Sequence, residues 1–339
     1  MQAWLNRRWY GSQGSCAALR PLERIYGATL ARRRARAGGA ERLGAPVIVV
    51  GNLTVGGTGK TPLTVWIARE LSRRGLPVGV ISRGYGRSGS DVRVLEPDSS
   101  WREVGDEPLI LRRSGCDTAV GRDRVAAARA VLGRGARVIV SDDGLQHLSL
   151  ARDCSIVVVD GARGFGNGRL LPAGPLREPL ERLALADALV LNGESEHPSL
   201  RAAAAHFPRI VLRMDLLPAP AVALASGERR ALETFRGRPV HAVAGIGHPQ
   251  RFFRDLRARG LEVLEHPFPD HYPLRGPDLA FGDDLPVLMT EKDAVKWGHP
   301  ADPRLWFVPV EAAFSDADAA RLTELLRRTV ESFARPPGG

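Results

Sequence analysis

The feature that most constrains the fold is a glycine-rich segment between a short apolar run and a periodic one. Residues 47–52 read VIVVGN, residues 54–61 read TVGGTGKT, and residues 61–75 read TPLTVWIARELSRRG. A strand, a glycine-rich turn and a helix in this order let backbone N–H groups wrap phosphates at the helix N-terminus. The segment therefore predicts a nucleotide phosphate loop made of Thr54, Val55, Gly56, Gly57, Thr58, Gly59, Lys60 and Thr61.

Two side chains of this loop have specific expected roles. Lys60 is placed to reach the β- and γ-phosphates of a nucleotide, and the hydroxyl of Thr61 to bind Mg²⁺. The loop departs from the general pattern at its first position, where Thr54 stands instead of glycine.

Apolar runs alternate with longer periodic segments from residue 46 onward. The runs at 47–52, 77–84, 136–144, 154–161, 187–193 and 209–215 predict strands, and 61–75 and 121–135 predict helices that end in glycine. Such alternation is typical of a mostly parallel sheet covered by helices. Residues 162–182 are rich in glycine and proline and predict a long functional loop. We expect an α/β chain with a P-loop NTPase-like domain at 43–215 and a smaller C-terminal α/β domain at 216–339.

The first 42 residues carry most of the net charge of +10, because they hold nine arginines against two acids. Within residues 16–36, apolar side chains recur every three or four positions between arginines, which predicts a basic amphipathic helix. Trp4, Trp9 and Tyr10 stand just ahead of it. Such a segment suits an anionic membrane surface, and it equally suits a helix docked on its own domain. Both interpretations stay open.

Composition excludes several classes of protein. The three cysteines, Cys16, Cys116 and Cys154, are scattered and show no C-x-x-C spacing, which argues against a disulfide framework or a zinc site. No apolar stretch approaches the roughly 18 to 20 residues that span a bilayer, and the N-terminus has no signal-peptide pattern, so we expect a cytosolic protein. Almost all basic residues are arginine, which is typical of a GC-rich genome.

Three further motifs place acids where phosphoryl transfer could use them. Asp142 and Asp143 follow an apolar strand, where a second element of phosphate-loop proteins supplies a carboxylate to the magnesium shell. Asp106 and Glu107 lie in GDEP, and His271 lies in PFPDHYPL. A base held by an orienting partner would help a hydroxyl attack a phosphate. On spacing alone these residues could also be helix caps or ordinary hydrogen-bonded side chains.

The motifs GNLTVGGTGKTP, ISRGYGR, GDEP, SDDGLQH, LLPAGPLREP, DHY and TEKDAVK occur together and in order over residues 52–296. The series resembles the tetraacyldisaccharide 4'-kinase family, in which a small hydroxyl residue is common at the position of Thr54. The resemblance implies transfer of the ATP γ-phosphoryl group to the 4'-hydroxyl of a tetraacylated glucosamine disaccharide 1-phosphate, giving lipid IVA. It also implies peripheral attachment to the anionic cytoplasmic face of the inner membrane.

The resemblance further implies roles for individual residues. Asp106 would be the base and His271 its partner from the other domain. The candidate magnesium ligands are Thr61, Glu107, Asp142 and Asp143, and the residues expected to line the substrate cleft are Arg83, Tyr85, Gln146, His147 and Arg177.

Three rival functions fit the sequence less well. A membrane-associated ATPase switch of the partitioning type would carry a signature lysine where this chain has Val55. A GTP-dependent metal chaperone would need an N-K-x-D motif and a cluster of histidines or cysteines, and the chain has neither. A nucleic-acid binder would interleave its charge with aromatic residues, whereas here the charge lies beside an apolar helix face. No obligate protein partner is evident.

Overall fold

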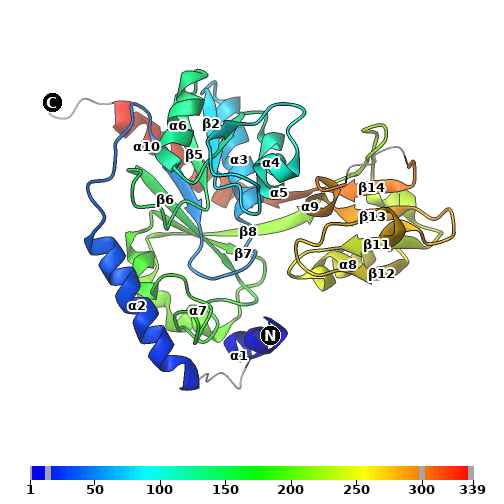
Figure 1. The fold of residues 1–339 in the computed structure, drawn as a ribbon, viewed down its shortest axis with the longest axis horizontal. Coiled ribbons are helices and arrows are strands. Elements are labelled where there is room, and N and C mark those ends of the chain that lie inside the picture. The colour runs from blue at the N-terminus through cyan, green and yellow to red at the C-terminus, as the bar shows by residue number, and fades with distance from the viewer. Residues whose placement is uncertain (1, 12–16, 298–301, 335–339) are drawn as a thin grey trace.

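The computed structural model describes residues 2–11, 17–297 and 302–334 as two α/β units on separate sheets (Figure 1). The larger unit holds nine strands in the order β15-β8-β7-β6-β1-β5-β2-β4-β3. Seven of them, from β8 to β4, run parallel, while β3 and β15 pair antiparallel at the two edges. Their bounds are β1 (Val47–Gly51), β2 (Val78–Ser82), β3 (Arg93–Val94), β4 (Asp117–Val120), β5 (Val138–Asp142), β6 (Cys154–Asp160), β7 (Ala188–Asn192), β8 (Ile210–Pro218) and β15 (Val310–Ala313).

Helices cover both faces of this sheet, which explains why its central strands are apolar at almost every position. On one face, Ile48 and Val50 pack with α3 (Lys60–Arg73) and α10 (Asp316–Ala334). On the other, Val49 belongs to the core that includes α6 (Arg124–Gly133). The remaining helical elements are α4 (Trp101–Val104), α5 (Asp106–Leu111), α7 (Pro198–Ala202), η2 (Arg112–Ser114), η3 (Leu180–Leu185) and η4 (Ala204–His206).

The smaller unit holds a six-stranded sheet in the order β10-β9-β14-β13-β11-β12. Its strands are β9 (Ala221–Ala223), β10 (Arg229–Arg230), β11 (Val240–Ala244), β12 (Val263–Pro267), β13 (Val287–Thr290) and β14 (Leu305–Val308). Its helical elements are α8 (Pro249–Ala258), α9 (Glu291–Ala294), η5 (Leu232–Phe235) and η6 (Gly276–Leu279). Phe253 and Leu256 of α8 lie fully buried in its core.

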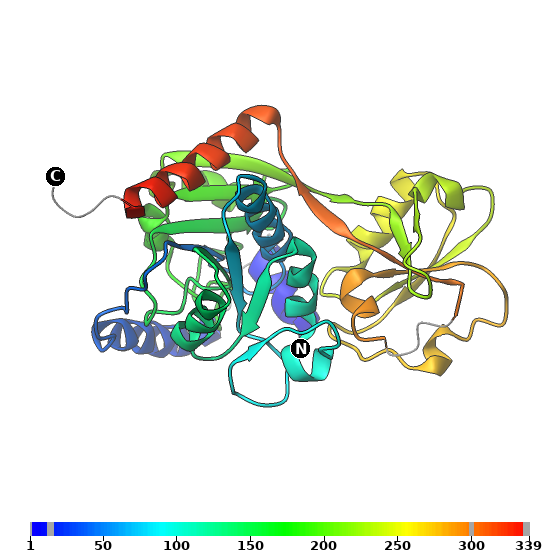
Figure 2. The same ribbon diagram turned by 90° about the horizontal axis from the view of Figure 1, so that it is seen from above.

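The expected architecture is confirmed, and the six predicted strands of the larger unit correspond to β1, β2, β5, β6, β7 and β8. The last segment differs from the expected boundary at residue 216. Strand β15 pairs with β8 through Ala312 and Leu216, and α10 buries Leu322 and Leu326 against the larger sheet. Residues 310–334 therefore return to the larger unit, because their apolar faces complete its core (Figure 2).

The two N-terminal helices contact the larger unit in different ways. In α1 (Gln2–Tyr10), Trp9 is only 5% exposed and its indole N–H donates to the Pro172 carbonyl at 3.2 Å. In α2 (Arg20–Ala35), which follows the single turn η1 (Ala17–Leu19), no residue is buried. Helix α2 exposes 51% of Leu22 and 63% of Ile25. Trp9 is thus part of the protein core, while Leu22 and Ile25 of α2 face outward and Tyr26 of the same helix donates to the Arg177 carbonyl.

Candidate active site

The glycine-rich segment forms a tight loop between β1 and the first residue of α3. Gly56 and Gly59 adopt φ values of 98° and 95°, which favour glycine. A Cβ atom on Gly59 would also lie 2.8 Å from the amide nitrogen of Asn192. The predicted phosphate loop therefore has the backbone that its sequence requires, and α3 begins at Lys60 directly behind it.

Side chains from other strands hold this loop in place. The Asn192 amide donates to the Thr58 carbonyl at 3.0 Å, and the Arg163 guanidinium donates to the Gly57 carbonyl. Arg163 is itself fixed by Asp160 at 3.0 Å. Neither Asn192 nor Arg163 was singled out in the sequence. Asn192 ends a predicted strand, so the rule that ligands bind at the carboxyl ends of parallel strands could have indicated it.

Asp142 and Asp143 are adjacent but have opposite electrostatic environments. Asp142 ends β5, is almost fully buried, and accepts hydrogen bonds from the hydroxyls of Thr64 at 3.1 Å and Thr61 at 3.4 Å. Burial, together with the negative charge of Glu107, raises the pKa of Asp142 to about 7. A cation bound here would stabilise its ionised form.

Asp143 has cationic partners. Its carboxylate pairs with Arg177 at 2.8 Å and with Lys60 at 3.7 Å. Burial acts to raise the pKa of Asp143, but the charges of Lys60 and Arg177 outweigh it and hold that pKa well below its usual range. Asp143 also adopts a positive φ of 50°, a conformation that few non-glycine residues hold. This carboxylate is therefore ionised and fixed in position.

The site fits a magnesium nucleotide. In the part of the chain that the structure describes, no group of three His, Cys, Asp or Glu side chains could hold a metal by itself. Mg²⁺ commonly keeps several waters and uses only one or two carboxylates plus substrate phosphates. The hydroxyl of Thr58 and the amide oxygen of Asn192 are buried at the loop with no hydrogen-bond partner among the described residues. These two unpaired polar atoms at the loop are therefore available to bind a ligand.

A carboxylate and a histidine meet where the two units touch. Asp106, at the start of α5, is 4% exposed, and its Oδ2 lies 2.9 Å from Nδ1 of His271 in the segment after β12. Burial acts to raise the pKa of Asp106, but the hydrogen bond from His271 and the charge of Lys292 give a net lowering. The same hydrogen bond raises the pKa of His271. The structure therefore brings together the two residues that the sequence only suggested as a pair.

Glu107 and Lys292 form a second contact between the units. The Lys292 ammonium lies 3.1 Å from Oε1 of Glu107. Lys292 is the second residue of α9, which begins at Glu291. Burial acts to lower the pKa of Lys292, but the carboxylates of Glu107 and Asp106 outweigh it and raise that pKa. Lys292 was not predicted to belong to the site. Its rarity in an arginine-rich chain was the available signal, since the sequence holds only three lysines.

The residues expected to line the substrate cleft fall into two groups. Arg83 and Tyr85 are exposed after β2, and the Tyr85 ring centroid lies 5.8 Å from that of His271. The others lie deeper. Gln146 donates to the Asn52 carbonyl at 3.1 Å, and Arg177 bonds both Asn52 and Asp143.

His147 belongs to the deeper group as well. Burial, with the charges of Arg124 and Arg83, lowers the pKa of His147 to about 4. Gln146, His147 and Arg177 thus support the floor of the site, while Tyr85 borders the Asp106–His271 pair and the charge of Arg83 acts on His147.

Comparisons with known proteins lead to one family. A family model described as tetraacyldisaccharide-1-P 4'-kinase matches residues 16–331. A tetraacyldisaccharide 4'-kinase from Alkalilimnicola ehrlichii is 51% identical over 317 residues, covering 92% of each chain. One from Pseudomonas aeruginosa is 47% identical over 339 residues, covering 94% of this chain and 97% of the relative.

A solved structure gives the same result for the fold. The crystal structure of the "apo" form of LpxK from Aquifex aeolicus in complex with ATP is 27% identical, with a TM-score of 0.77. The match covers 93% of this chain and 99% of that one. With a family model and relatives that both span nearly its whole length, this chain belongs to the tetraacyldisaccharide-1-phosphate 4'-kinase family.

Proposed function

We propose that this enzyme transfers the γ-phosphoryl group of ATP to the 4'-hydroxyl of a tetraacylated glucosamine disaccharide 1-phosphate, forming lipid IVA in lipid A biosynthesis. One observation carries the proposal. Lys60 of the phosphate loop and Glu107, the neighbour of the Asp106–His271 pair, both act electrostatically on Asp142. A nucleotide phosphate at the loop and an acceptor hydroxyl at Asp106 would therefore both lie near this carboxylate.

In this proposal, Asp106 accepts the proton of the sugar hydroxyl as the oxygen attacks phosphorus. An ionised carboxylate is ready to do so, and His271 orients it through the 2.9 Å hydrogen bond. The lowered pKa of Asp106 alone would make it a weak base. The raised pKa of His271 places the protonation of the pair nearer to neutral pH, so the two residues titrate as one unit.

Among the candidate magnesium ligands, the contacts favour Asp142. Asp143 already pairs with Lys60 and Arg177, and Glu107 already pairs with Lys292. The carboxylate of Asp142 accepts hydrogen bonds only from the hydroxyls of Thr61 and Thr64 among the described residues. Mg²⁺ held there would neutralise charge on the transferring phosphoryl group. Thr61 and Asp142 would hold the ion, and Asp143 would hold Lys60 in place.

The lipid acceptor calls for contact with a membrane surface, and α2 is suited to make it. Its exposed Leu22 and Ile25 lie among the arginines of residues 1–42, as in helices that rest in an anionic interface. No described helix is both long and apolar enough to cross a bilayer. We propose peripheral attachment through α2 at the cytoplasmic face of the inner membrane. Trp9 of α1 contributes to the core instead.

The test is direct. Purified protein is incubated with labelled ATP, Mg²⁺ and disaccharide 1-phosphate in detergent micelles, and the lipid fraction is analysed for label at the 4'-position. We expect labelled lipid IVA from the intact enzyme and at least about a hundredfold less from Asp106→Asn. ATP hydrolysis without a labelled lipid would instead support an ATPase switch.

A further inference from the structure

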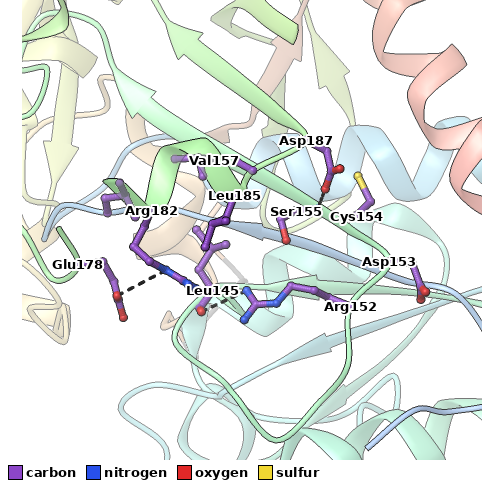
Figure 3. A pocket seen from close by; sticks show the side chains of 12 residues that line it. Leu145, Arg152, Asp153, Cys154, Ser155, Val157, Glu178, Arg182, Leu185 and Asp187 are labelled. Carbon is purple, nitrogen blue, oxygen red and sulfur yellow. Dashed lines mark hydrogen bonds and ion pairs between the residues drawn. The ribbon is translucent and has the colours of Figure 1, made fainter. Parts of the chain in front are cut away.

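A pocket of about 400 Å³ lies between the start of β6 and η3, apart from the Asp106–His271 pair (Figure 3). One part of its wall is apolar and includes Leu145, Val157 and Leu185. The other part is charged and includes Arg152, Arg182 and Glu178. Figure 3 shows Arg152 and Arg182 reaching toward one another across the pocket, with Glu178 beyond Arg182.

The pocket wall holds three acids and two arginines, but around Glu178 the arginines outnumber the acids. Glu178 pairs with Arg34 from the end of α2, and it lies 3.9 Å from Arg182. Arg152 donates to the Leu145 carbonyl at 3.3 Å, which is a neutral acceptor. Arg34 and Arg182 thus share one carboxylate, and Arg152 forms no ion pair among the described residues.

The other two acids in the wall are engaged elsewhere. Asp153 pairs with Arg42 and accepts from the Val47 N–H at 2.9 Å. Asp187 accepts from the Ser155 N–H at 2.7 Å. Neither carboxylate forms an ion pair with Arg152 or Arg182 among the described residues, so Arg152 has no acidic partner and Arg182 has only the shared Glu178, both next to apolar surface.

Burial and the crowding of positive charge lower the pKa values of two of these guanidinium groups. Burial, and then the charge of Arg182, lowers the pKa of Arg152. The same two causes, in the same order, lower the pKa of Arg34. An anion between these groups would relieve both effects, because it supplies the missing negative charge and accepts bidentate hydrogen bonds.

We propose that the pocket binds the phosphodiester headgroup of an anionic glycerophospholipid, in addition to the acceptor lipid at the active site. The arginines would hold the phosphate, and the acyl chains would leave across Leu185, a large apolar side chain that is 66% exposed at the rim. A free inorganic anion would gain nothing from this apolar rim, whereas an amphiphile matches both halves of the pocket.

The position of the pocket fits this occupant. Glu178 in the pocket wall pairs with Arg34 of α2, and Leu22 and Ile25 of the same helix face outward. Helix α2 runs along the side of the larger unit opposite the smaller one (Figures 1 and 2). A phospholipid held here would give the enzyme a second point of contact with the bilayer, which would fix its orientation as well as its attachment.

The test measures binding of dihexanoyl phosphatidylglycerol, as soluble monomers, to the full chain by calorimetry. Arg182→Gln should weaken binding about tenfold, the effect of losing one hydrogen bond between charged groups. Arg201→Gln, which removes the same charge from the exposed end of α7, should leave binding unchanged. Equal losses in both variants would mean that only the overall charge matters and would overturn the proposal.

A second comparison separates a lipid from a free phosphate. Leu185→Ser changes an exposed side chain and should keep the thermal stability of the protein, yet it should weaken binding of the short-chain lipid several-fold. Inorganic phosphate should bind far more weakly than the lipid and should not respond to Leu185→Ser. Inorganic phosphate that binds as tightly as the lipid would refute a phospholipid site. So would variants Arg182→Gln and Leu185→Ser that both bind the lipid as tightly as the unchanged protein does.

Discussion

The two sides of the active site are built in different ways. The nucleotide side lies wholly on the larger sheet, where Lys60, Asp142 and Asp143 follow adjacent parallel strands and are held by short-range contacts. The acceptor side joins two units, because Asp106 belongs to the larger one and His271 to the smaller one. Its geometry depends on how the units are placed as well as on how each one folds.

The difference teaches where this enzyme can be adjusted. A phosphate loop held by contacts within one unit is preorganised for its ligand. A pair of residues that spans two units can be assembled or separated by a small rotation, so the smaller unit could control when the base is oriented. Lys292 and Glu107 make the second contact between the two units, and this contact should also help to hold His271 beside Asp106.

The largest effect should come from breaking the acceptor pair. Asp106→Ala should lower kcat by about 10²- to 10⁴-fold, because general base catalysis is lost, with little change in ATP affinity. His271→Ala should lower kcat less, and the double variant should lose far less than the product of the two. Steady-state kinetics with detergent-dispersed lipid would measure all three. If the losses multiply, the residues do not act as a unit, and Asp142 or Asp143 becomes the better candidate for the base.

A somewhat smaller loss is expected on the nucleotide side. Lys60→Ala should raise the barrier by about 3 kcal/mol or more, since it removes a charge that stabilises the transferring phosphate. Thr61→Ala should act in the same direction. Unlike the variants of the pair, Lys60→Ala should also weaken ATP binding, which equilibrium titration would detect. Arg73→Ala, at the exposed far end of α3, is the matched control and should retain turnover. Near-normal turnover in Lys60→Ala would rule out this loop as the ATP site.

The pH dependence of stability offers a finer comparison. The hydrogen bond to Asp106 raises the pKa of His271, so its stabilising contribution is complete below the usual histidine value and is lost as pH rises through the folded value. His271→Gln should therefore lower the thermal midpoint more at about pH 5.5 than at about pH 8.5.

His147 provides a control of opposite sign. Burial lowers the pKa of His147 to about 4, so the protein loses stability through this residue as pH falls below the usual histidine value. His147→Gln should consequently cost less at the lower pH than at the higher one. The same trend in both variants would show that the histidine contacts do not set the pH dependence.

The smallest effect should arise outside the active site, on α2. Leu22→Ser together with Ile25→Ser should reduce binding to anionic vesicles by roughly thirtyfold, taking about 1 kcal/mol for each half-exposed apolar side chain. Turnover of lipid dispersed in detergent should stay the same, because neither side chain touches the site. Vesicle flotation would measure the first effect. If vesicle binding does not change, α2 is only a structural helix.

The nucleotide side could be predicted from the sequence because its signals are local. Strand, glycine turn and helix follow one another along the chain, and Asp142 and Asp143 come directly after an apolar strand. The acceptor pair is separated by 165 residues, and no periodicity indicates that two such distant loops touch. Only the resemblance to a family suggested that pairing.

Other features escaped prediction for similar reasons. Arg163 contacts the phosphate loop through a single hydrogen bond, which leaves no pattern in the surrounding sequence, and only its place at the end of a strand marks Asn192. Trp9 stands among arginines and suggested a membrane interface, yet it is buried against the Pro172 carbonyl. Burial of a single aromatic side chain depends on tertiary contacts, and these are not encoded in its neighbours.

The return of β15 to the larger sheet makes the smaller unit an insertion within a host domain. The chain leaves the larger sheet at the end of β8 and re-enters it at β15, where Pro218 lies opposite Val310. The two connections to the smaller unit therefore run next to each other, and Figure 2 shows β8 and β15 side by side. Joining residue 218 to residue 310 by a short turn should leave a host that still folds and binds ATP but has no His271. Such a minimal host would allow nucleotide recognition to be studied separately from phosphoryl transfer.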